Sequence, residues 1–113
     1  MSLSESSDPF GPQFVVSNDD DTSATLSITG EVDVANSPEL RDALYSLIDR
    51  GITNVIVDAS GMDFIDSSGL GVLVGALKHI RDRSGALIVR SLQPATKRVF
   101  EVTGLMNVFT IPD

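Results

Sequence analysis

The chain of 113 residues is long enough for one compact domain and too short for two of ordinary size. It has no cysteine and a single histidine, which excludes disulfides and thiolate metal sites, and we expect no metal and no cofactor. The net charge is −8 and no basic patch occurs, so we expect no nucleic-acid partner. No apolar stretch is long enough to span a membrane and no signal peptide is evident, which predicts a cytoplasmic protein without a membrane partner.

Residues 1–12 are rich in Ser, Asp, Pro and Gly and predict a flexible leader, which leaves a single domain over residues 13–113. Two strands are predicted next, over residues 13–17 and 25–29, the second from its alternation of polar and apolar side chains. The acidic run over residues 18–21 suits a hairpin turn between them.

A helix is predicted to start at Asn36 or Ser37, with Pro38 tolerated in its first turn, and to end at Gly51. The elements after it are a buried strand over residues 55–57, a helix over 67–83, a strand over 86–89, a helix over 94–102 and a last short strand over 108–111. The order β-β-α-β-α-β-α-β predicts an α/β fold: a mixed, mostly parallel sheet of about five strands with helices packed against it.

The segment over residues 58–71 links a buried strand to the second helix. Ligand and modification sites favour such positions beyond the carboxyl ends of parallel strands. Ser67 lies at the N-terminus of this helix, where the dipole and free amides favour an anion such as phosphoserine. Capping alone explains one Ser or Asp, so a plain N-cap role for Asp66 or Ser67 stays open.

The helix that begins at Ser67 has two different faces. The face that must pack on the sheet carries Leu70, Leu73, Val74, Leu77 and Ile80. The opposite face carries Ser68, Gly71, Val72, Gly75, His79 and Asp82. Each glycine on an exposed helix face costs roughly 1 kcal/mol relative to alanine, but it lets a partner surface approach the backbone closely. Packing of these glycines against another part of the domain is the alternative.

Three motifs follow one another in a specific order. They are Gly-Glu-Val-Asp at residues 30–33, MDFIDSSGLGVL at residues 62–73, and QPATKRVF with Thr-Gly-Leu at residues 93–100 and 103–105. Together they resemble the STAS domain family, in particular its bacterial branch of anti-sigma factor antagonists. The resemblance extends over about residues 13–111.

The resemblance implies a phosphorylation switch. In antagonists of this family the first serine after the aspartate of Asp-Ser-Ser-Gly-Leu, here Ser67, is phosphorylated by an anti-sigma factor that is itself a serine kinase. The unmodified antagonist binds that kinase and frees the sigma factor, phosphorylation blocks binding, and a phosphatase restores it. The expected partner-binding residues are Glu31, Asp33, Asp66, Ser68, Gly69, Gly71, Val72 and Gly75.

Several roles stay open at this level. Asp66 either orients the Ser67 hydroxyl or caps the helix, and Glu31 and Asp33 either flank the binding surface or only form a turn. Within the same fold, an accessory subunit of a lipid-transport system or of an anion transporter is the alternative function.

An enzyme is not expected, because Gly-X-Ser-X-Gly is absent and His79 lies about 18 Å along the helix from Ser67. Members of the family usually continue past the last strand with a further helix that this sequence lacks. The apolar surface that such a helix would cover predicts a weak homodimer.

Overall fold

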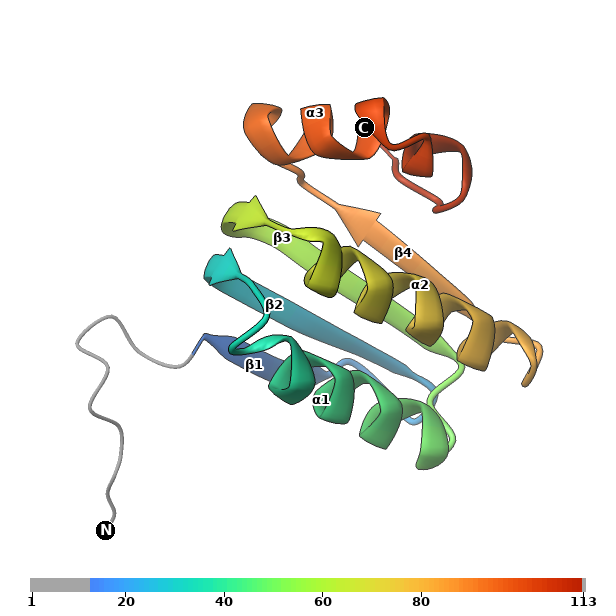
Figure 1. Ribbon diagram of the computed structural model, residues 1–113. Coiled ribbons are helices and arrows are strands. Elements are labelled where there is room, and N and C mark those ends of the chain that lie inside the picture. The colour runs from blue at the N-terminus through green and yellow to red at the C-terminus, as the bar shows by residue number, and fades with distance from the viewer. Residues whose placement is uncertain (1–12, 113) are drawn as a thin grey trace, which may run out of the picture.

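The computed structural model describes residues 13–112, so the predicted leader over residues 1–12 lies outside the described residues, as does Asp113. Along the described chain the elements are β1 (Phe14–Asn18), β2 (Ser23–Val32), α1 (Ser37–Asp49), β3 (Asn54–Ile65), α2 (Ser67–Arg81), β4 (Ala86–Arg90), α3 (Pro94–Val102) and a short 3-10 helix, η1 (Leu105–Asn107) (Figure 1). No helix within this range is long and apolar enough to cross a membrane.

The strands form one sheet in the order β1-β2-β3-β4. β1 is antiparallel to β2, and the other two pairs are parallel. This confirms the predicted mixed, mostly parallel α/β sheet. The strand predicted over residues 108–111 does not form, because the N–H groups of Val108 and Phe109 bond back to the Leu105 carbonyl, at 3.0 and 3.2 Å, instead of to a neighbouring strand. Only Thr110 pairs, in a single bridge to Ile88, so the sheet has four strands in the described residues rather than about five.

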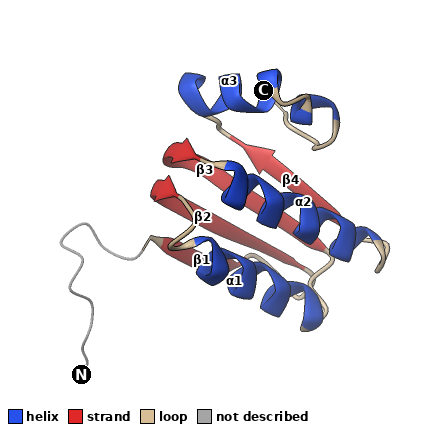
Figure 2. Cartoon of the chain, viewed as in Figure 1, coloured by secondary structure: helices blue, strands red, loops and turns tan. Residues whose placement is uncertain are grey.

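The helices are distributed unevenly over the sheet. α1 and α2 lie side by side across one face, and α3 lies apart from them on the β4 side (Figure 2). Alternation along the strands directs one set of apolar side chains toward α1 and α2, where they are buried: Ala24, Leu26, Ile28, Val55, Val57, Leu87 and Val89. α3 is held by the fully buried Phe100, whose ring meets that of Phe109 edge-to-face at 5.8 Å.

β3 is much longer than predicted. It continues from the expected residues 55–57 through Asp58, Ser60 and Asp63 to Ile65, and its pairing with β2 extends to Ile65 opposite Val32. β2 likewise continues to Val32, so the motif over residues 30–33 is mostly strand rather than turn. Both strands therefore reach the point where α2 begins, and this extension positions the candidate site.

The hairpin between β1 and β2 is fixed by one carboxylate. Asp20 Oδ1 accepts hydrogen bonds from the backbone N–H groups of Thr22 and Ser23, both at 2.9 Å. The N–H of Thr22, followed by that of Ser23, favours the charged form and lowers the pKa of Asp20 from its ordinary value of 3.8. A lowered pKa in the folded state means that this contribution to stability is present above the unfolded pKa and lost as the pH falls through the folded pKa.

We therefore expect Asp20→Ala to destabilise the protein at about pH 6 and to have a smaller effect at about pH 2, because the contribution of the wild-type carboxylate is lost as the pH falls through its lowered pKa. Urea unfolding of both proteins at the two pH values measures this difference. The adjacent, exposed Asp21→Ala is the matched control. An equal loss at both pH values would show that the charge of Asp20 does not matter.

Candidate functional site

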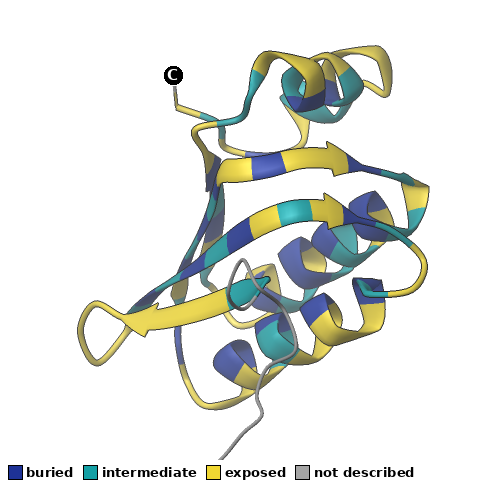
Figure 3. Ribbon diagram, turned by 90° about the vertical axis from the view of Figure 1, so that its left-hand side faces the viewer, coloured by how far each residue is buried: buried dark blue, intermediate teal, exposed yellow. Residues whose placement is uncertain are grey.

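The candidate site forms where β2, β3 and α2 meet. Val32 pairs with Ile65, and Glu31 pairs with Phe64 on the neighbouring strand. The Asp66 N–H donates to the Val32 carbonyl at 3.1 Å, which joins the last residue of β2 to the residue before α2. Figure 3 views the molecule from the side at which β2 and β3 end. The two predicted motifs, at residues 30–33 and 62–73, are thus brought together.

Asp66 is the N-cap of α2. Its backbone is extended, and Oδ1 accepts from the N–H groups of Ser68 at 2.8 Å and Gly69 at 3.1 Å. The structure therefore shows the capping role that sequence left open. It also shows that two of the amides expected to be free for an anion are already bonded to a carboxylate. Ser67, the first residue of the helix, is exposed, and Ser68 is half-buried.

Asp33 holds the turn between β2 and α1. Its Oδ1 accepts from the N–H groups of Ala35 at 2.9 Å and Asn36 at 3.3 Å. The Asn36 side chain does not cap α1, as was allowed from sequence, but accepts from the Asp33 N–H at 2.9 Å and donates to the Glu31 carbonyl at 2.9 Å. The half-buried Asp33 thus has a structural role, whereas the Glu31 side chain is exposed at the end of β2.

The glycines of α2 differ in their surroundings. Gly69 is buried, and a Cβ there would lie 2.7 Å from side-chain atoms of both Ile65 and Val32. This corrects its prediction as a partner contact: Gly69 lets the first turn of α2 pack onto the strands. Gly71 is exposed with nothing within 4 Å of a Cβ, and Val72 is half-buried. Of the two glycines predicted on the outer face, Gly71 alone has an open surface beside it.

The outer face of α2 is not wholly free, because α1 lies against part of it. A Cβ on Gly75 would lie 3.0 Å from the Tyr45 hydroxyl, and the Tyr45 ring stacks on His79 with centroids 4.5 Å apart. His79 Nε2 lies 2.8 Å from Asp49 Oδ1, which also pairs with Arg83 at 3.3 Å. Gly75 therefore serves packing between α1 and α2, the alternative named from sequence, rather than a partner surface.

Two exposed apolar side chains at this end were not singled out from sequence. Phe64 is 46% exposed and Val34 is 72% exposed. For Phe64, the sequence contained a signal that could have predicted its exposure. Phe64 and Ile65 are consecutive apolar residues, and consecutive side chains in a strand point to opposite faces, so one of them had to point away from the core. Ile65 is the buried one, at 1%.

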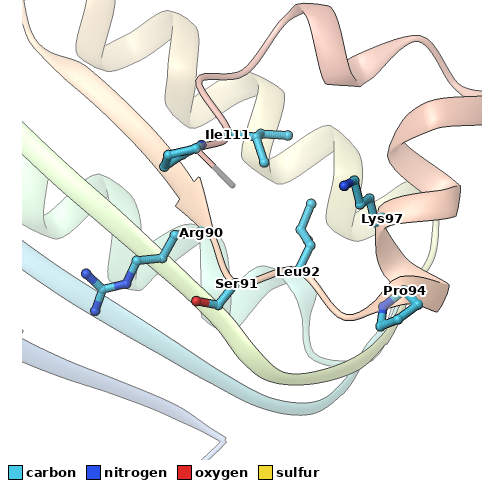
Figure 4. A pocket seen from close by; sticks show the side chains of 7 residues that line it. Arg90, Ser91, Leu92, Pro94, Lys97 and Ile111 are labelled. Carbon is cyan, nitrogen blue, oxygen red and sulfur yellow. The ribbon is translucent and has the colours of Figure 1, made fainter.

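A surface pocket lies elsewhere, between the end of β4 and the start of α3. Figure 4 shows Leu92 between Ile111 and Lys97 in this pocket. Its lining residues are Arg90, Ser91, Leu92, Pro94, Lys97, Ile111 and Pro112. None of the predicted site residues lines it.

The two contrasting glycines give a matched test of the packing. Gly69→Ala should destabilise the protein by about 1–3 kcal/mol, because the new methyl group meets two buried side chains. Gly71→Ala should be neutral or stabilise by up to about 1 kcal/mol, because the methyl group points into open space. The free energy of unfolding in urea measures both. Equal effects would contradict the assigned surroundings.

The cap is tested with two substitutions of one residue. Asp66→Ala should cost about 1 kcal/mol, since two amides lose their acceptor, whereas Asp66→Asn keeps an oxygen acceptor and should cost less. Thermal or urea unfolding at neutral pH compares them. If Asn is as destabilising as Ala, the charge on the helix dipole stabilises α2 and the hydrogen bonds do not.

Comparisons with known proteins agree on the family. The STAS domain model matches residues 13–113. The anti-sigma-B factor antagonist of Bacillus subtilis is 34% identical over 86 residues, which cover 76% of this chain and 78% of that protein. The corresponding antagonist of Listeria monocytogenes is 34% identical over 87 residues, or 76% and 75% of the two chains. The crystal structure of an anti-sigma factor antagonist from Mycobacterium paratuberculosis is similar with a TM-score of 0.75 at 27% identity, covering 93% of this chain and 88% of that one.

These matches confirm the resemblance that the three motifs predicted. The fold, the motif order and the extent of the match all agree: the chain belongs to the STAS domain family, among relatives named anti-sigma factor antagonists.

Proposed function

We propose that this chain is an anti-sigma factor antagonist switched by phosphorylation of Ser67. Its unphosphorylated form binds an anti-sigma factor that is a serine kinase, and so releases a sigma factor in the cytoplasm. A phosphatase that hydrolyses phospho-Ser67 restores binding. The observation that carries the proposal is the exposed Ser67 hydroxyl at the first position of α2, directly after the capping Asp66. This role requires binding and no catalysis by the chain itself.

The modification is a phosphoryl transfer from ATP held by the kinase. The bond between Ser67 Oγ and the γ-phosphorus forms as the bond to the ADP oxygen breaks, and the hydroxyl proton passes to a base of the kinase. Asp66 supports this step by holding Ser67 in the first turn, since its Oδ1 is occupied by the two capped amides.

The surroundings of Ser67 favour a loss of binding after phosphorylation. The phosphate adds about −1.5 to −2 charges beside Asp66, in a segment whose nearest other carboxylate along the chain is Asp63. Because Asp66 already occupies the Ser68 and Gly69 amides, the phosphate cannot be neutralised by them without breaking the cap. A penalty of about 3 kcal/mol would weaken binding more than a hundredfold.

The partner surface that follows from these positions is smaller than the predicted one. Around Ser67 it includes Ser68, Gly71 and Val72 on α2, with the exposed Glu31 at the end of β2. Asp33 and Asp66 lie at its border and shape it through their backbone hydrogen bonds. Gly69 and Gly75 support it from within.

The switch is tested by capture from a lysate of the source bacterium with wild type, Ser67→Ala and Ser67→Asp as baits. Wild type and Ser67→Ala should recover an anti-sigma factor kinase, and Ser67→Asp should recover little, because its carboxylate adds charge at the same place. The recovered kinase with ATP should then phosphorylate wild type but not Ser67→Ala, as read by mass spectrometry.

Ser68→Ala is the matched control, since it removes the adjacent hydroxyl and leaves Ser67 in place. Phosphorylation that persists in Ser67→Ala and disappears in Ser68→Ala would move the switch to the neighbouring residue. Equal recovery of a transporter or lipid-trafficking subunit by all three baits would replace the sigma-factor role with the accessory role named from sequence.

A further inference from the structure

Two large apolar side chains near the ends of β2 and β3 are exposed. Phe64 is 46% exposed at the end of β3, while the other phenylalanines of the described residues are buried or half-buried. Val34, at 72% exposure, follows β2 within two residues of the bond that joins Val32 to Asp66. Both residues belong to the two strand ends that lead to Ser67, and exposed apolar residues beside a proposed modification site indicate a contact surface.

The charge around these two residues is of one sign. Residues 31–36 and 61–71 contain four carboxylates, Glu31, Asp33, Asp63 and Asp66, and no Lys or Arg. Glu31 is the register partner of Phe64 on the neighbouring strand, and Asp63 precedes Phe64 in β3, so both carboxylates belong to positions directly adjacent to Phe64 in the sheet. Both carboxylates are exposed, and among the described residues no ion pair holds either of them.

We propose that Phe64 is the apolar anchor of the surface that binds the anti-sigma factor kinase, and that the kinase offers it an apolar pocket bordered by Lys or Arg side chains that face Glu31 and Asp63. This inference rests on the proposed function. Aromatic side chains are enriched in the centre of interfaces, and opposite charges at the rim raise the association rate and fix the register.

The distances within the chain allow one partner to cover both positions. Ser67 follows Phe64 by three positions, so their Cα atoms are at most about 11 Å apart. An interface of standard size buries about 800 Å² on each partner, which reaches well beyond that distance. An interface of that size around Ser67 is therefore large enough to include Phe64 as well.

A cationic border on the partner is compatible with inhibition by phosphate. After the transfer, the group that faces phospho-Ser67 is the phosphate end of ADP, which is anionic. The charges of Glu31 and Asp63 meet the border, whereas the new charge at Ser67 meets the nucleotide. Attraction at the border and repulsion at the centre thus act on different atoms.

The anchor is tested by binding of purified variants to the anti-sigma factor kinase of the source bacterium in the presence of ADP. Phe64→Ala should weaken binding by about 10-fold or more, and Phe64→Leu, which keeps apolar volume, should recover most of it. Val102→Ala, an exposed apolar residue of α3, is the matched control and should change the dissociation constant less than about twofold. In a phosphorylation assay Phe64→Ala should raise KM and leave kcat unchanged, as expected for a docking residue.

The charged border is tested by salt dependence. The double variant Glu31→Gln, Asp63→Asn should bind more weakly at low salt and lose most of the salt dependence of the wild type. The double variant Asp21→Asn, Glu101→Gln removes the same charge from exposed positions in the β1–β2 hairpin and α3. This control should keep the salt dependence of the wild type.

Three results would overturn the inference. The first is Phe64→Ala binding like Val102→Ala. The second is equal salt dependence of the two double variants. The third is a change in self-association of Phe64→Ala, by sedimentation, with unchanged kinase affinity, which would assign the surface to a second copy. If the wild type itself neither binds the kinase nor is phosphorylated, the proposed function fails too; if it does both and Phe64 is indifferent, only the anchor fails.

Discussion

The geometry of the site depends on Asp66. Its N–H bonds to the last carbonyl of β2, and its carboxylate bonds to two amides of α2. One residue thus fixes a strand end, a helix start and the position of Ser67 between them. Because an unmade bond at a partly buried helix end is costly, the helix cannot shift by a residue without losing this joint. The exposed hydroxyl is therefore held by its neighbours and needs no contacts of its own.

α2 combines three kinds of contact around its axis. Its apolar side, with residues such as Leu73 and Ile80, is buried on the sheet. Its middle outer side meets α1 through Gly75, His79 and Tyr45. The first two turns are exposed at Ser67 and Gly71, where a Cβ on Gly71 would meet nothing within 4 Å. A partner that binds at the N-terminal end of α2 therefore contacts a helix held in place, since the remainder of α2 is packed on two sides.

The sequence predicted most of the fold because its signals are local. The alternation in β2, the apolar periodicity of α2 and the glycine and proline boundaries all depend on residues near one another in the chain. The length of β3 was missed because Asp58 and Ser60 look like loop residues, although the strand continues through them in its pairing with β2. The last strand was overpredicted, since Thr110 finds a single pairing position on β4.

For the site, the motif located Ser67 and Asp66 correctly at the start of α2, but it could not sort the glycines. Gly69 and Gly71 are equivalent in sequence, and only packing against Val32 and Ile65 separates the buried glycine from the exposed one. Gly75 depends on Tyr45, which is 30 residues earlier in the chain. Such distant contacts follow from the crossing of α1 and α2 and leave no trace in the local pattern.

The position of Ser67 at a fixed helix start also affects how the phosphorylated fraction of such a protein would respond to a signal. In the proposed switch, a change of charge at Ser67 without a rearrangement of the backbone would give each molecule two states that differ by a covalent bond and by no slow refolding step. The fraction of molecules that carry the phosphate would then be set by the ratio of the kinase rate to the phosphatase rate. Its response is graded and free of hysteresis from this domain, so any threshold in the pathway has to arise in the enzymes that act on it.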